Sequence, residues 1–164
     1  MATNKFTLDE EDYSEPYTLI GIHCGEEEYK LAFLLNQKLN MRLKRKTSDL
    51  DLSHHGLMIS FPLYDFEDKS NYTHYYLVAN KCRSQDASLQ SSGGLFNEIE
   101  SPRSNIHFLL PEFKKVDYFL TIFSDYETEP IREIVGELME IKQIVSAYEI
   151  DPESIKSKSN LIFD

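Results

Sequence analysis

The side chains best suited to chemistry in this sequence are its histidines, its cysteines and one short basic run. Asp49, Asp51, His54 and His55 form a local cluster that could supply metal ligands. Zinc sites, however, are usually built from short-spaced pairs such as CxxC or HxxxH, and neither spacing occurs here. Adjacent side chains also point to opposite sides of an extended chain, which separates the two histidines. We therefore interpret this segment as a loop and expect no metal ion and no other cofactor.

Nucleophilic catalysis has no better support in the sequence. His23 and Cys24 are neighbours, so a strand would point them apart. There is no GxSxG elbow and no Gly-rich phosphate loop. We therefore expect no catalytic residues and no enzyme activity. Cys24 and Cys82 could form one disulfide, but a chain without an export signal meets a reducing compartment, so we expect two buried free thiols.

Positive charge is concentrated in one part of an acidic chain. The 164 residues include 28 acidic and 17 basic ones, for a net charge of −11, yet residues 30–48 hold six bases and no acid. These bases either pair with acidic groups of the same molecule or dock an acidic partner that is steered by charge. The candidate docking patch consists of Arg42, Lys44, Arg45 and Lys46.

The overall charge limits the classes of partner. Contacts to phosphates need an excess of Lys and Arg, so the net charge disfavours RNA, although the basic island keeps RNA among the partners to test. Residues 1–16 are acidic and lack the basic start and apolar core of a secretory signal. No apolar run approaches the roughly 20 residues that cross a bilayer. We therefore expect a cytoplasmic protein without membrane contact.

Apolar periodicity predicts the elements that would position these groups. Helical spacing predicts one helix through Leu31 and Leu39, ending at Asn40, and a second from Ile131 to Ile141. Strands are predicted over residues 17–23, 41–44, 57–64, 72–80, 106–110, 116–123 and 144–150.

The segments between these elements are predicted as well. Residues 65–71 are turn-like and would join the strands on either side into a hairpin. Residues 83–105 are rich in Ser and Gly and predict a long, mobile loop. The last apolar residues, 161–163, are expected to dock on the body of the protein.

This order of elements predicts an α+β fold. Two helices, each followed by a strand, would cover one face of a mostly antiparallel sheet in a two-layer domain. The nearest architecture is the split βαβ core of ferredoxin-like and ACT-like domains. We expect this domain to span residues 17–164, after a flexible acidic segment, 1–16.

The stretch from Leu110 to Tyr118, LPEFKKVDY, resembles the signature of the IPExxxVDY family, with Leu in place of the first Ile. The similarity extends to residues 17–22, 43–46, 147–152 and 158–163, so it covers nearly the whole chain from Tyr17. The resemblance implies a small cytoplasmic protein from the Bacteroidota group of bacteria. The resemblance does not indicate an activity, and it provides no catalytic residues to carry over to this sequence.

The signature itself allows a structural and a functional interpretation. Proline fixes φ and lacks an N–H donor, so it could end one strand and start a tight turn. The two acids could cap backbone donors or pair with Lys114 and Lys115. Alternatively, the signature frames a ligand or partner site at the mouth of a hairpin. Its candidate residues are Pro111, Glu112, Val116, Asp117 and Tyr118.

Two functions remain open at this point. One is a non-catalytic interaction or adaptor module that docks an acidic protein through the basic patch, with the loop over 83–105 as a second surface. The other is an ACT-like regulatory domain that binds a small molecule where Gly25 joins a strand to a helix. ACT-type sheets often pair, so a homodimer is among the expected states. This second hypothesis is an analogy from fold.

Overall fold

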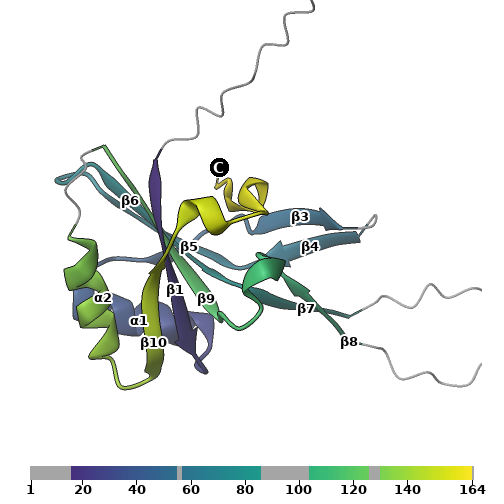
Figure 1. The fold of residues 1–164 in the computed structure, drawn as a ribbon, viewed down its shortest axis with the longest axis horizontal. Coiled ribbons are helices and arrows are strands. Elements are labelled where there is room, and N and C mark those ends of the chain that lie inside the picture. Colours follow the sequence, from purple (N-terminus) through teal and green to yellow (C-terminus); the bar gives the residue numbers. More distant parts are fainter. Residues whose placement is uncertain (1–15, 55–56, 86–103, 126–129, 164) are drawn as a thin grey trace, which may run out of the picture.

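The computed structural model describes residues 16–54, 57–85, 104–125 and 130–163 (Figure 1). Its centre is a six-stranded sheet in the order β10-β1-β9-β6-β5-β2, with every neighbouring pair antiparallel. The bounds of these strands are β1 Tyr17–Cys24, β2 Lys44–Arg45, β5 Leu63–Asp68, β6 Thr73–Ala79, β9 Tyr118–Ser124 and β10 Ile144–Ile150.

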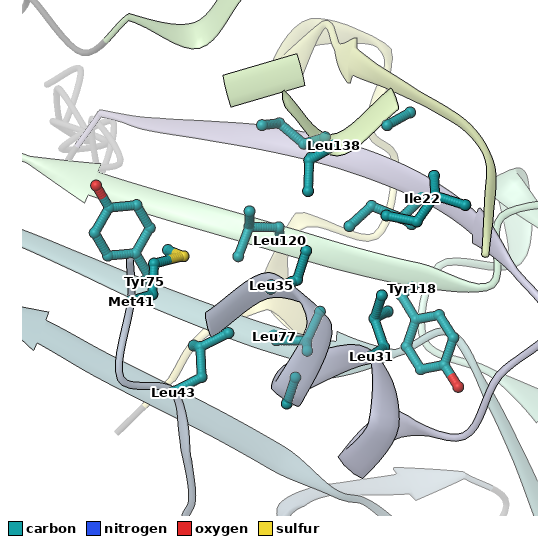
Figure 2. Packing of buried hydrophobic residues seen from close by; sticks show 14 of the residues in the cluster. Ile22, Leu31, Leu35, Met41, Leu43, Tyr75, Leu77, Tyr118, Leu120 and Leu138 are labelled. Atoms are coloured by element: carbon teal, nitrogen blue, oxygen red, sulfur yellow. The ribbon is translucent and has the colours of Figure 1, made fainter. Parts of the chain in front are cut away.

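Two helices, α1 (Glu28–Leu39) and α2 (Ile131–Met139), cover one face of this sheet. Figure 2 shows Leu31 and Leu35 of α1 and Leu138 of α2 packed over the apolar side chains of β1, β6 and β9. Helix α1 ends where predicted, because Asn40 adopts a left-handed conformation with φ of 53°. The α+β class and the mostly antiparallel sheet with two helices are thus confirmed.

The other face of the sheet is covered by shorter segments. The ribbon of β3 (Leu50–His54) and β4 (Leu57–Phe61) packs there, with the 3₁₀ turn η1 (Pro111–Phe113) and the C-terminal turns η2 (Pro152–Ser154) and η3 (Lys158–Leu161). Leu161 is buried, and the ring of Phe163 stacks on Tyr76 with 4.6 Å between centroids. The prediction that the C-terminal segment docks is therefore confirmed.

The chain order of the main elements matches a split βαβ arrangement. In the order β1-α1-β6-β9-α2-β10, the four strands lie side by side as β10-β1-β9-β6. Strands β2 to β5 are inserted between α1 and β6. Because β5 and β2 add to the free side of β6, the insertion extends the sheet and places the basic segment at its outer edge.

The predicted strand over 41–44 is mostly wrong, since only Lys44 and Arg45 pair with β5. The side-chain amide of Asn36 on α1 explains the difference. Its Oδ1 accepts from the backbone N–H of Leu43 at 2.8 Å, and its Nδ2 donates to the Leu43 carbonyl at 3.1 Å. The amide thus takes the place of a neighbouring strand. Met41 and Leu43 are still buried while Arg42 is exposed, as the period-two pattern predicted.

The loop interpretation of the segment around His54 is wrong as well. Residues 50–54 form β3 and pair with β4. Pro62 cannot donate to a ladder and separates β4 from β5, so the predicted strand over 57–64 is two strands. The predicted hairpin exists as β5 and β6, with a shorter turn because β5 continues to Asp68.

The prediction of a loop over 83–105 is wrong at both ends of that range, which belong to strands. Strand β7 (Lys81–Gln85) pairs with β8 (Ser104–Phe108), and residues 86–103 lie outside the described residues. The segment 1–16 also lies outside them, apart from Pro16. Both cysteines are free, as predicted, but Cys82 is only half-buried. No helix within the described ranges is long and apolar enough to span a membrane.

Candidate functional site

The signature turn is organised by Asn80, a fully buried polar residue just after β6. Its Nδ2 donates to the carbonyls of Phe113 at 2.8 Å and Val116 at 2.9 Å, while its Oδ1 accepts from the N–H of Leu110 at 2.9 Å. The backbone N–H of Asn80 also donates to the carbonyl of Asp117. A buried amide is costly unless its groups are paired, and here they hold both ends of the turn in place.

Glu112 joins this turn to the C-terminal segment. Its carboxylate accepts from the backbone N–H groups of Lys156 at 2.8 Å and Ser157 at 2.9 Å, and from the Ser157 hydroxyl at 3.1 Å. Burial opposes ionisation of this carboxyl, but the backbone hydrogen bonds outweigh it and lower the pKa of Glu112. The acid caps backbone donors, one of the two structural roles that the sequence suggested.

Asp117 and Tyr118 join the signature to the turn between β1 and α1. The Asp117 carboxylate accepts from the backbone N–H of Cys24 at 2.9 Å and lies 3.3 Å from the Lys81 ammonium. The Tyr118 hydroxyl donates to the carbonyl of Glu26, and burial raises the pKa of this phenol. Figure 2 shows the Tyr118 ring beside α1, at the level of Leu31.

A cleft of about 580 Å³ opens where these groups meet. The sequence hypothesis of a ligand at Gly25 refers to this place. Glu26, at its rim, forms an ion pair with Lys30 at 2.8 Å. A Cβ atom added to Gly25 would meet no atom within 4 Å, so the turn has free space beside it. The lining residues are Cys24, Gly25, Glu26, Glu27, Glu28, Ala79, Lys81, Asp117 and Tyr118.

The four patch residues differ in their surroundings. Arg42 and Lys44 are exposed, and neither has an acidic partner among the described residues. Arg45 forms an ion pair with Asp49 at 2.5 Å, and its guanidinium lies 6.0 Å from the centre of the Tyr64 ring. Residue 46 is held closer to the sheet: the Nζ of Lys46 lies 5.7 Å from the Tyr76 ring centre.

The basic island is therefore partly neutralised within the molecule. Lys30 pairs with Glu26, and Lys38 at the end of α1 pairs with Glu140. Together with Arg45 these bases fit the intramolecular interpretation. Lys44 in the outermost strand β2, and Arg42 just before that strand, fit the docking interpretation.

Other reactive side chains show no catalytic arrangement in the described part of the chain. Burial raises the pKa of the Cys24 and Cys82 thiols, which disfavours a reactive thiolate. The rings of His54 and His107 meet at 5.7 Å between the two ribbons. Across the described ranges, no three His, Cys, Asp or Glu side chains stand close enough together to hold a metal ion.

Sequence reasoning missed Asn80 and Lys81. Their only signal was an Asn after a strand of β-forming residues, which is also typical of an ordinary turn. Comparison with known proteins identified no matching family model, no matching curated protein and no matching solved structure. The resemblance to the IPExxxVDY family and the cytoplasmic location stay predictions.

Proposed function

We propose that this protein is a non-catalytic docking module that binds an acidic polypeptide through the exposed bases at its β2 edge. The observation that carries the proposal is the position of Arg42 and Lys44, both exposed and without an acidic partner among the described residues. The backbone between these two residues is held in place, because the Asn36 side-chain amide forms hydrogen bonds with both the N–H and the carbonyl of Leu43.

Charge favours an acidic polypeptide over other partners. A net charge of −11 repels polyanions at a distance. An acidic partner is therefore attracted only where it contacts the basic edge directly. A flexible peptide can follow this edge, whereas an RNA duplex would bring many more phosphates near the acidic remainder. Exposed ion pairs are weak and screened by salt, so binding should weaken steeply as ionic strength rises.

The test is fluorescence anisotropy of a labelled oligoglutamate peptide titrated with the full chain. The double variant Arg42→Glu with Lys44→Glu should weaken binding by about tenfold or more, since two attractive contacts become repulsive. The matched control makes the same change in net charge at two exposed lysines outside the patch, Lys142→Glu with Lys158→Glu, and should change the affinity far less. Equal loss in both variants would indicate only an overall charge effect and would refute the proposal.

An RNA arm distinguishes the remaining partner class. Labelled single-stranded oligouridylate is titrated under the same conditions as the peptide. Tighter binding of RNA than of oligoglutamate, lost in the double variant, would reassign the basic edge to RNA. Binding of neither probe at low salt would refute the docking proposal. The bases would then serve to prevent pairing with another strand, a role that edge lysines often have.

A second candidate function rests on the cleft at Gly25. We propose a small zwitterion, such as an amino acid, as its ligand, in an ACT-like regulatory role. The split βαβ topology supports this, and so does the chemistry of the lining, where the Lys81 ammonium lies 3.3 Å from the Asp117 carboxylate and Glu27 also lines the cleft. An ammonium group would meet the acids and a carboxylate would meet Lys81.

A thermal-shift screen of amino acids and nucleotides tests the second candidate. A specific ligand should raise the melting temperature of the wild-type chain, by mass action on the folded state. Gly25→Val, which adds a side chain where there is free space, should abolish the shift while the unliganded melting temperature stays close to wild type. No stabilisation by any compound, or the same shift in Gly25→Val, would refute it.

A further inference from the structure

The two edges of the central sheet differ in how they are protected against pairing with another strand. At one edge, β2 is two residues long and both residues, Lys44 and Arg45, are exposed bases. Short strands and lysines are common means of blocking an edge. At the other edge, β10 is seven residues long and contains neither Lys nor Pro. Among the described residues, no strand pairs with the outer side of β10.

The outer surface of β10 is apolar for an edge strand. Val145 is 78% exposed and Tyr148 is 41% exposed. The register with β1 skips Val145, because His23 lies opposite Ser146 while Cys24 lies opposite Ile144, and this bulge turns Val145 outward. Tyr148 is held in place by a hydrogen bond of 3.0 Å between its hydroxyl and the His23 ring. The bulge is confined to the start of the strand, and the remaining edge, from Ser146 to Ile150, is a template for another strand.

We propose that the β10 edge binds a second copy of this chain, with the two β10 strands pairing antiparallel about a two-fold axis at Ala147. This register sets the seven residues of each strand opposite one another, and the N–H of Ala147, which donates to Sδ of Met139 at 3.1 Å, exchanges that weak contact for the partner strand. The register places Val145 opposite Glu149 of the partner subunit, and Ser146 opposite the partner's Tyr148. Two six-stranded sheets then continue as one, and α2, which packs on β10, lies on the same side of the sheet in both copies.

Charge on this strand suits a copy of itself. Glu149 is the one charged residue in β10. In the proposed register, the two glutamates lie four residues apart along the strands, about 13 Å, which exceeds the Debye length at physiological salt. Each Glu149 also faces the end of the partner strand that follows Lys142 of the partner subunit. A protein with a net charge of −11 can therefore self-associate here without placing like charges in contact.

The test measures the dimer dissociation constant of the full chain by sedimentation equilibrium. Val145→Glu places a carboxylate opposite the partner's Glu149 twice per dimer and should weaken dimerisation by about tenfold. Val145→Lys places an ammonium there and should leave the dimer at least as tight. The double variant Val145→Glu with Glu149→Lys should restore it. The control is Met58→Glu, which adds the same charge at a 67% exposed site on β4 and should have no effect.

These variants change exposed side chains, so circular dichroism should show an unchanged fold in each. A wild-type chain that stays monomeric at every concentration would overturn the proposal. The β10 edge would then be a candidate site for a strand of a different protein. A dimer that responds equally to Val145→Glu, Val145→Lys and Met58→Glu would also overturn it, because such a dimer uses another surface. The basic edge at β2 lies on the far side of the sheet, so failure here leaves the docking proposal intact.

Discussion

The Asp117 carboxylate accepts a hydrogen bond from the backbone N–H of Cys24, 2.9 Å away and 93 positions earlier in the chain. The signature segment thus forms a hydrogen bond with the last residue of β1, and its residues Asp117 and Tyr118 form one wall of the cleft at Gly25. Its structural and functional interpretations are compatible, because the residues that fix the turn also shape the cleft.

Asn80→Ala should be one of the most destabilising substitutions in the signature region. It leaves the N–H of Leu110 and the carbonyls of Phe113 and Val116 without their partner, and unpaired buried groups cost about 1–3 kcal/mol each. We expect a loss of about 3 kcal/mol in the free energy of unfolding, measured by urea denaturation followed by circular dichroism. Asn71→Ala, at an exposed turn, is the control and should lose far less.

Glu112→Gln should remove part of the acid sensitivity of folding. The folded pKa of Glu112 lies below the ordinary value of 4.5 for a glutamate, so this group stabilises the fold above the unfolded pKa. That contribution is lost as the pH falls from about 4.5 through the folded pKa. At neutral pH we expect the variant to be about 1 kcal/mol less stable, with the difference vanishing in acid. Urea titrations across this range measure it, and a constant difference at all pH values would contradict the assignment.

Asn36→Ala should release the basic segment without unfolding the protein. It removes both hydrogen bonds that the Asn36 amide makes to the Leu43 backbone. Hydrogen exchange measured by mass spectrometry should then speed up in a peptide covering residues 41–46 while β9 remains protected. The exposed neighbour Gln37→Ala is the matched control. Unchanged exchange in the Asn36 variant would mean that burial of Met41 and Leu43 is sufficient to fix this segment.

Asp49→Asn should strengthen docking of an acidic peptide. Asp49 pairs with Arg45 at 2.5 Å, so its removal frees a third base at the proposed surface. We expect the affinity for oligoglutamate to rise about two- to fivefold, the range that one exposed ion pair supplies. Glu153→Gln makes the same change in net charge at an exposed site on η2 and is the control. An equal gain in both variants would trace the effect to net charge.

Gly21→Ala tests the packing of β1 against the C-terminal half of the chain. A Cβ atom there would lie 2.9 Å from Cδ1 of Ile150, the flexible end of that side chain. We expect a cost of about 1–2 kcal/mol from overpacking. Ile150→Val deletes the clashing atom, so the double variant should be more stable than the sum of the single effects implies. Additive losses would show that the strain comes from Val116 or the backbone.

Much of the fold could be predicted because the pattern and the local chemistry agreed. The stop at Asn40 and the apolar stripe of α2 both follow from local rules and appear in the structure. The strand β3 was missed because its polar residues, such as Asp51 and Ser53, face solvent on one side of a ribbon. Its pairing with β4 is decided by tertiary packing, which a short window of sequence does not contain.

The candidate site was harder to predict than the fold. The cluster of bases could be recognised from the sequence. The sequence did not show which of them form ion pairs, because Lys38 pairs with Glu140, which lies 102 positions later in the chain. The cleft was anticipated only at Gly25. Its other walls come from β9 and from Lys81. The strand order and the hydrogen bonds of Asn80 bring these residues next to the turn between β1 and α1. Contacts of this kind depend on topology.

The sheet order also has a consequence for how the chain folds during synthesis. Strand β1 starts at Tyr17, yet both of its neighbours, β9 and β10, lie beyond residue 117. Strand β1 therefore keeps two open edges until the segments beyond residue 117 have been made. Pairings between such distant segments form slowly and expose apolar strands in the meantime. The nascent chain thus depends on early shielding of Leu19, Ile20 and Ile22, three side chains of β1 that end up fully buried.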